Sequence, residues 1–185
     1  MLDTSSSSNS DSDADDSASL VVSAIRVGSS EGAGTAGSIG SALTGTYGQL
    51  TIAANGSYTY VANQDAADAL DAGDIVTDSF NYTVSDGTAT DTAVITITVI
   101  GVNDTPAADN ETGAVNEDAT LTVSDGTSDL LHGDTDADDS ASLTVSAIRT
   151  GAEGGSGTAG SIGSGLTGTY GTVSYTHLTL PTTDR

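Results

Sequence analysis

Length, composition and charge limit what this chain can do. It has 185 residues, and its 26 Asp and Glu residues against three Lys and Arg residues give a formal net charge of −23. A surface of that sign repels nucleic acids and anionic membranes, so neither is an expected partner, and the sequence shows no signal peptide or membrane span. The absence of cysteine excludes disulfides and thiolate metal sites. Bound cations would relieve the charge repulsion and add folding free energy.

An acidic stretch near the start of the chain occurs twice. Residues 11–20 return as residues 134–143, an offset of 123 positions, and 30 of the 38 positions from 11 to 48 are identical in the second copy. A long fixed period indicates tandem modules of one structure. The predicted divisions are a low-complexity start at 1–10, a first module at 11–102 that lacks its opening strand, a linker at 103–113, the first half of a second module at 114–172 and a tail at 173–185.

The first module is predicted to open with a strand and a long loop. The strand covers residues 20–27, with Leu20, Val22 and Ala24 on one face. The loop covers residues 28–42 and contains the pattern G-x-G-x-x-G. A dinucleotide site needs a helix directly after that pattern, and the following S-I-G-S-A-L-T-G cannot form one. The nucleotide interpretation is therefore rejected.

A hairpin and a helix are predicted next. The hairpin has strands at 49–53 and 57–61, joined by an Asn-Gly turn, which is a strong hairpin signal. The helix is predicted at 64–72, with Asn63 as its N-cap and Gly73 in the left-handed position after its C-terminus.

Two further strands complete the first module. Apolar and polar residues alternate over 80–84 and 93–99, and Asp86-Gly87 begins the turn between them. Many short strands with regular turn signals and little helix predict an all-β fold, a β-sandwich. Because the first module lacks an opening strand, we also predict that one edge of its sheet is open.

The second module is predicted to begin with the strand region that the first lacks. This region is 114–131, with a strand through 121–123, and the repeated acidic stretch follows it. The similarity to the first module stops after Gly171, since residues 174–185 share one identity with residues 51–62. The tail from Val173 resembles an in-frame translation of a transposon-based sequencing adapter. We therefore expect residues 173–185 to be non-native and exclude them from functional reasoning.

Both acidic stretches have the pattern D-x-D-A-D-D, which predicts calcium binding. Calcium takes six to eight oxygen ligands, and closely spaced loop carboxylates can supply several of them. An EF-hand is excluded, because Asp and Val replace its required Gly and Glu at loop positions 6 and 12 in both copies. A solvated acidic surface is the alternative explanation. The candidate ligands are Asp11, Asp13, Asp15, Asp16, Asp134, Asp136, Asp138 and Asp139, with Asp86 and Asp91 as further candidates.

Seven motifs follow one another between residues 55 and 138. They are N-G-S-Y-T-Y at 55–60, D-A-L-D-A-G-D at 68–74, D-S-F-N-Y-T-V-S-D-G at 78–87, D-T-A-V-I-T-I-T-V at 91–99, G-V-N-D-T-P at 101–106, V-N-E-D at 115–118 and D-T-D-A-D at 134–138. Together they resemble the VCBS-type and cadherin-like repeats of large bacterial surface adhesins. The resemblance implies immunoglobulin-like β-sandwich modules in tandem, with calcium at or near their junctions.

The resemblance also implies further ligands and a location. Asn103, Asp104, Glu117 and Asp118 would join the acidic stretch at 134–138 as calcium ligands near the linker. The parent protein would be exported to the cell surface, commonly by type I secretion. The neighbouring repeats of the same chain would be its partners, and other domains would bind a host or matrix ligand.

We expect a calcium-rigidified structural spacer that supports adhesion or biofilm formation. The alternative is a module that itself binds a carbohydrate or a protein, and a glycan array with the intact repeat would separate the two. An enzyme is not expected. The two histidines, His132 and His177, form no recognisable catalytic pattern with Ser and Asp.

Overall fold

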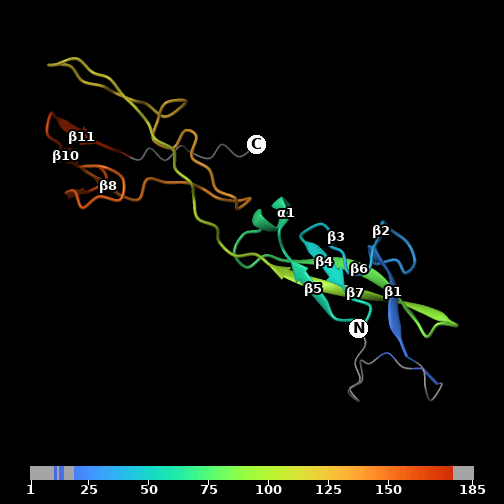
Figure 1. Ribbon diagram of the computed structural model, residues 1–185. Coiled ribbons are helices and arrows are strands. Elements are labelled where there is room, and N and C mark those ends of the chain that lie inside the picture. Colours follow the sequence, from blue (N-terminus) through green and yellow to red (C-terminus); the bar gives the residue numbers. More distant parts are fainter. Residues whose placement is uncertain (1–10, 12, 15–18, 177–185) are drawn as a thin grey trace. The chain divides into compact units, whose positions relative to one another are not determined.

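The computed structural model describes residues 11, 13–14 and 19–176. The chain forms two compact units, one of Met1–Asp104 with Ala137–Ser140 (unit 1) and one of Thr105–Asp136 with Ala141–Arg185 (unit 2). Apart from α1 (Asp65–Asp68), the one helix of the described residues, every regular element in both units is a strand (Figure 1). The predicted all-β fold is confirmed.

Unit 1 consists of two antiparallel sheets. The first has the strand order β2-β1-β6-β7 and the second the order β3-β4-β5. The strands are β1 (Val21–Val27), β2 (Ala36–Gly37), β3 (Leu43–Thr44), β4 (Gln49–Ile52), β5 (Tyr58–Val61), β6 (Ile75–Ser85) and β7 (Thr90–Ile100). Strands β2 and β7 are the outer strands of the first sheet. An edge left open by the missing opening strand stays a prediction.

Both predicted hairpins of unit 1 are formed. Strands β4 and β5 pair from Gln49↔Val61 to Ile52↔Tyr58, and the turn between them places Gly56 at φ 82°. Strands β6 and β7 pair over eleven residues each, with Gly87 at φ 95° in the turn. These positive φ angles explain why each turn contains glycine, which reaches them without steric cost.

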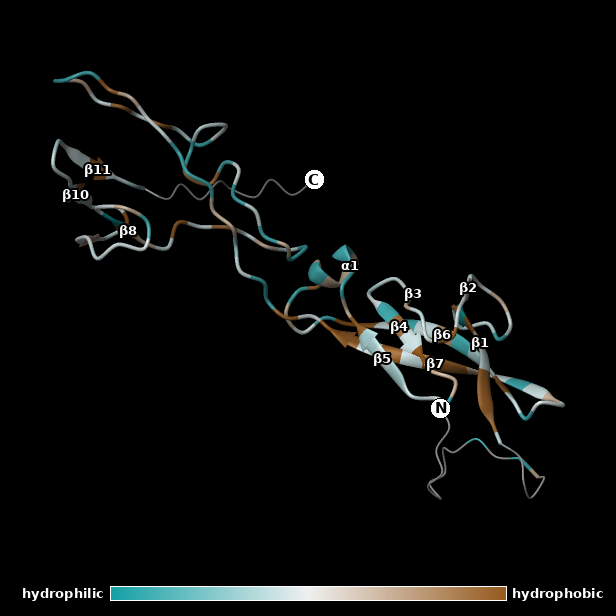
Figure 2. Cartoon of the chain, viewed as in Figure 1, coloured by the Kyte–Doolittle hydropathy of each residue, from teal (hydrophilic) through white to brown (hydrophobic). Residues whose placement is uncertain are grey.

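The hydrophobic core of unit 1 lies between its two sheets. Phe80 and Tyr82 of β6 pack with apolar residues of β1, and Leu50 of β4 packs against them from the other sheet. Phe80 and Leu50 are both 0% exposed. Figure 2 shows the hydrophobic residues of this unit concentrated in its strands. Full burial of one such side chain contributes about 1.5–3 kcal/mol, so this cluster is the main source of stability for the sandwich.

The predicted face of the first strand is wrong in one respect. Val22 is buried, as expected, but its buried companion is Ile25 rather than Ala24. The pairing with β6 shifts between Val22 and Ala24, which is a β-bulge. The extra residue changes the alternation, so positions 22 and 25 point to the same face.

The predicted helix at 64–72 is shorter than expected. It covers only Asp65–Asp68, has no buried residue, and Gln64 rather than Asn63 occupies the N-cap position. Gly73 has φ 95° but lies in a separate turn, where its N–H donates to Gly101 O at 3.1 Å. A segment that buries no apolar face has little to stabilise a longer helix.

The described part of unit 2 contains four short strands in two pairs. Strand β8 (Ile148–Arg149) pairs with β9 (Ala159–Gly160), and β10 (Gly165–Thr167) pairs with β11 (Thr172–Ser174). The strand predicted at 121–123 is not formed, and Leu121 and Val123 are exposed. In the described part of unit 2 no strand pairs with this segment, so its backbone lacks the partner that would hold it extended.

Candidate metal sites

Unit 2 brings three carboxylates together. The isolated bridge between Ala107 and Thr135 is held by N–H···O bonds of 2.8 and 2.9 Å. Two residues further along, the Asp109 N–H donates to Asp134 Oδ1 at 3.0 Å. The carboxylate oxygens of Asp109, Glu111 and Asp134 all lie within 4.8 Å of one another, the one such group of three or more metal-ligating side chains in residues 11, 13–14 and 19–176.

These three carboxylates carry charges that repel one another. The pKa of Glu111 is raised, first by its hydrogen bond with Asp109, then by desolvation and by the negative charges of Asp109 and Asp134. A raised carboxyl pKa is the usual sign of like charges that share a site. A cation among these oxygens would remove the repulsion, and oxygen-only ligands suit a hard ion such as calcium.

Sequence reasoning found one member of this group and missed two. Asp134 belongs to the predicted acidic stretch, whereas Asp109 and Glu111 lie in the segment predicted as a linker. The sequence D-N-E at 109–111 could have predicted this pair, because residues two positions apart in an extended segment have their side chains on the same face. Asp136 does not join the group, and Glu117 and Asp118 lie exposed at the turn from Asn116 to Ala119.

The last part of the second acidic stretch belongs to unit 1. Asp138 Oδ2 accepts a hydrogen bond from the Asp104 N–H at 3.2 Å, and the Asp139 N–H donates to Ala69 O at 3.1 Å. Ser140 donates to the Asp71 carboxylate through both its N–H, at 3.2 Å, and its hydroxyl. The structure thus brings together Asp104 and Asp138, two residues predicted as ligands.

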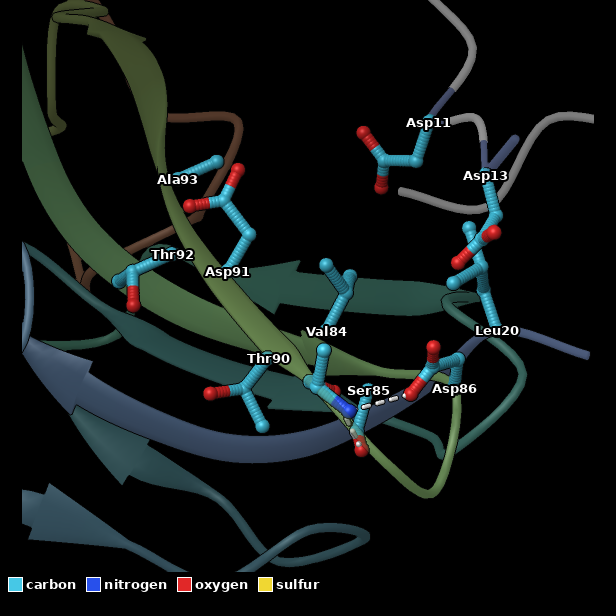
Figure 3. Close-up of a pocket in the computed structure, with 11 residues that line it drawn as sticks. Asp11, Asp13, Leu20, Val84, Ser85, Asp86, Thr90, Asp91, Thr92 and Ala93 are labelled. Carbon is cyan, nitrogen blue, oxygen red and sulfur yellow. Dashed lines mark hydrogen bonds between the residues drawn. The ribbon is translucent and has the colours of Figure 1, made fainter. Parts of the chain in front are cut away.

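Unit 1 has a second cluster of acidic side chains, near the turn of its β6–β7 hairpin. Asp11 and Asp13 line a cavity of about 360 Å³ together with Asp86 of the turn and Asp91 of β7. Figure 3 shows these four carboxylates around the cavity. The pKa of Asp86 is lowered by the N–H groups of Ala89 and Thr88, each 2.6 Å from its Oδ1.

The cavity joins candidates that are far apart in the sequence. Asp86 and Asp91 were predicted separately from the first acidic stretch, and the structure places them beside its first two carboxylates. Asp15 and Asp16 lie outside the described residues, so their predicted role stays a prediction.

One comparison with known proteins decides the family. The sequence model of the bacterial cadherin-like domain matches residues 2–101, more than half of the chain and nearly all of the continuous part of unit 1. The chain belongs to the bacterial cadherin-like domain family. A search of curated proteins and a search of solved structures found no match.

Family membership accounts for the coarse features of this cadherin-like protein. Such domains are non-catalytic structural or adhesion modules, repeated in surface proteins. The described residues hold no helix long and apolar enough to span a membrane. The internal repeat extends the assignment past the matched residues, because residues 134–171 repeat residues 11–48 at an offset of 123.

Proposed function

We propose that this cadherin-like chain is a calcium-stabilised spacer from a bacterial surface protein. The observation that carries the proposal is the group formed by Asp109, Glu111 and Asp134, whose oxygens lie within 4.8 Å of one another in a chain of net charge −23. Domains of this family generally bind calcium, which agrees with an all-oxygen ligand set. Backbone carbonyls and water would complete the six to eight ligands.

The four carboxylates around the unit 1 cavity are a second candidate site. Asp11, Asp13, Asp86 and Asp91 come from an N-terminal segment and a hairpin. An ion held by them would tie the N-terminal segment to the sheet. We expect this site to be weaker than that of unit 2, because its four carboxylates include no set of three within 4.8 Å.

The mechanical role follows from where the second acidic stretch lies. The continuous segment 134–140 contributes Asp134 and Asp136 to unit 2 and residues 137–140 to unit 1. An ion bound by Asp109, Glu111 and Asp134 would hold the start of this segment to residues 109–111 within unit 2. Repeated along an array, such connections would project a distant binding domain away from the cell.

The test compares melting of the full chain with and without calcium. A ligand that binds only the folded state stabilises it by about 2.7 kcal/mol at a hundredfold excess over Kd. We expect a higher Tm in millimolar calcium than in chelator, and a smaller gain for the double variant Glu111→Gln, Asp134→Asn. The control is Glu153→Gln, which removes one exposed carboxylate elsewhere in unit 2. Equal melting curves in calcium and chelator would reject the proposal.

Export and adhesion belong to the same proposal. We expect the parent protein to be exported, with type I secretion as the route, and its neighbouring repeats to be the direct partners of this segment. A spacer should bind nothing on a glycan array except through other domains. Specific glycan or protein binding by the intact repeat would favour a ligand-binding module instead.

A further inference from the structure

The turn between β4 and β5 places a side-chain amide directly before a glycine. Of the seven asparagines of the chain, Asn55 alone is followed by glycine. The backbone nitrogen of the next residue can attack an asparagine amide, and glycine has no Cβ to hinder that approach. Both groups are held together by the chain itself, so the reaction needs no encounter with a second molecule. Asn55 is exposed, and water therefore reaches the product.

The fold places two hydrogen-bond donors on the oxygen of this amide. Asn55 Oδ1 accepts bonds from the Ser57 N–H at 3.1 Å and from the Ser57 hydroxyl at 2.8 Å. Negative charge develops on this oxygen during the attack, because Asn55 Cγ becomes tetrahedral. Donors that are already in place where charge develops stabilise a transition state, as in an oxyanion hole. Ser57 therefore lowers the barrier to attack at this carbon.

Strand pairing holds the turn in this arrangement. The Ala53 N–H donates to Ser57 O at 2.8 Å, and the Gly56 N–H donates to Ala53 O at 2.9 Å. The pair Ile52↔Tyr58 lies at the end of the β4–β5 ladder next to the turn. The Gly56 nitrogen must leave Ala53 O before it attacks, so this bond opposes the reaction that the Ser57 donors favour.

The turn at Asp86-Gly87 shows why the amide matters. Asp86 Oδ1 also accepts two N–H groups, from Thr88 and Ala89, each at 2.6 Å. These bonds lower the pKa of Asp86, so its side chain is an ionised carboxylate at neutral pH. A carboxylate repels a nucleophile, and the same donors keep it in this unreactive form. Of the two turns, only the one at Asn55 presents a neutral acyl group to the glycine nitrogen.

We propose that Asn55 is a self-modification site, at which the Gly56 nitrogen displaces the side-chain amide. The bond from Gly56 N to Asn55 Cγ forms, the bond from Cγ to Nδ2 breaks, and Nδ2 leaves as ammonia with the proton that Gly56 N gives up. Water then opens the five-membered succinimide at either carbonyl, which leaves aspartate or isoaspartate at position 55. The steps need water alone, with no oxidant and no cofactor. Ser57 stabilises the oxyanion of the first step.

The two products would affect unit 1 differently. Aspartate oxygens accept the same Ser57 donors in charge-assisted bonds, and they add one negative charge to the formal −23. Isoaspartate carries the main chain through the side chain, which lengthens the turn by one methylene. Ala54 O accepts the Val22 N–H at 2.9 Å, so a lengthened turn disturbs β1 as well as the β4–β5 pair. The proposal does not depend on calcium binding.

The test incubates the folded full chain at mildly alkaline pH in water labelled with heavy oxygen. Peptide mapping by mass spectrometry should show residue 55 losing ammonia and gaining one labelled oxygen, ahead of every other asparagine. Ser57→Ala should slow this conversion about threefold or more, a smaller effect than the roughly 10²–10³ measured in water-excluded enzyme sites. Ser57→Thr keeps the hydroxyl and should keep the rate. The matched control is Thr59→Ala, which removes an exposed hydroxyl two residues further along β5.

Unfolding in urea separates the effect of the fold from that of the sequence. Wild type and Ser57→Ala should react at equal rates in urea, because the donors are no longer held on Asn55 Oδ1. Equal rates in the folded state, or a folded chain in which Asn55 does not react, would overturn the proposal. Melting compares the products: Asn55→Asp should keep the Tm of wild type, and the isoaspartate fraction should melt lower. An isoaspartate fraction that melts like wild type would overturn the proposed effect on the hairpin.

Discussion

Asp78 is a buried carboxylate that joins both sheets of unit 1. It is 4% exposed and accepts bonds from three loop N–H groups and, at 2.7 Å, from the Tyr60 hydroxyl of β5. Burial acts to raise its pKa, but the bonds from Tyr60 and the loop N–H groups outweigh burial and hold the pKa below its ordinary value. Burial raises the pKa of Tyr60, and the hydrogen bond to Asp78 and its negative charge raise it further. Asp78 is therefore ionised in the folded protein at neutral pH.

The first prediction concerns Asp78→Asn, which leaves buried N–H donors facing an amide. At pH 7 we expect a loss of about 2–4 kcal/mol in the free energy of unfolding of unit 1. A lowered folded pKa contributes stability that is present above the unfolded pKa, about 3.9, and is lost as the pH falls through the folded pKa. The difference in the free energy of unfolding between wild type and variant should therefore shrink below about pH 4. Urea titrations at several pH values measure this difference. A difference that stays constant down to about pH 2 would contradict an ionised Asp78 as the cause.

The second prediction uses the matched glycines of the two units. Gly45→Ala should destabilise unit 1 by about 1–3 kcal/mol, because its methyl meets Asp78 and Phe80 at less than 3 Å. Gly168→Ala should change stability by no more than about 0.5 kcal/mol, since its methyl meets only Gly171 O, at an ordinary contact distance of 3.6 Å. Chemical denaturation of the two single variants provides the comparison. Equal losses would show that the loop, rather than the covering strand, requires glycine.

At the scale of elements, β6 and β7 differ in their position in the sheet: β6 has a paired strand on both sides and β7 on one side. Strand β6 is central, and even its outward Asn81 is 1% exposed, because the loop 28–34 covers it. The Asn81 amide donates to Gly28 O and Ala33 O at 3.0 and 3.1 Å and accepts from the Gly32 N–H at 3.1 Å. Strand β7 pairs with β6 on one side only, over eleven residues that include no Lys and no Pro. Long outer strands of this kind favour association through their edges.

The third prediction therefore concerns Val94 of β7, which lies exposed on the outward face of this strand. Val94→Lys should reduce concentration-dependent association of the chain while the unfolding free energy changes by less than about 1 kcal/mol. Light scattering and sedimentation at increasing concentration would measure the association. The control is Val102→Lys, an exposed valine outside the strand, which should leave association unchanged. Association that is insensitive to Val94→Lys would place the contact elsewhere.

At the scale of the whole molecule, charge opposes folding. A net charge of −23 on 185 residues is spread over a chain with a thin core, whose fully buried side chains are few. Self-repulsion of that size destabilises a compact state. Cations that screen or bind the carboxylates act in the opposite direction.

The fourth prediction separates screening from specific binding. Raising NaCl from about 0.01 M to about 1 M shortens the Debye length from about 30 Å to about 3 Å, so the Tm in chelator should rise with salt. Calcium at millimolar concentration should add a further increase at fixed ionic strength, and magnesium a smaller one, because it gives up its waters reluctantly. Thermal melts followed by circular dichroism make the comparison. A Tm in calcium equal to that in NaCl at the same ionic strength would leave screening as the sole cause.

Much of the fold was predictable because its signals are local. Alternating apolar residues and the turns Asn55-Gly56 and Asp86-Gly87 specify both hairpins within one continuous stretch of sequence each. The bulge in β1 was not predictable, because no residue of that strand marks it and the pairing with β6 creates it. The helix was overestimated for a related reason: Asn63 and Gly73 are local cap signals, but Gln64 occupies the N-cap position, Gly73 lies in a separate turn, and no buried face extends the helix.

The sequence by itself determined the all-β class, the repeat at an offset of 123 and the acidic stretches, since each is a property of neighbouring residues or of the chain compared with itself. Only the tertiary structure decided which carboxylates meet. It joined Asp134 to Asp109 and Glu111, and it buried Asp78 about thirty residues from the loop it holds. Local patterns set backbone angles and faces, whereas the meeting of distant side chains depends on strand pairing and register across the whole sheet.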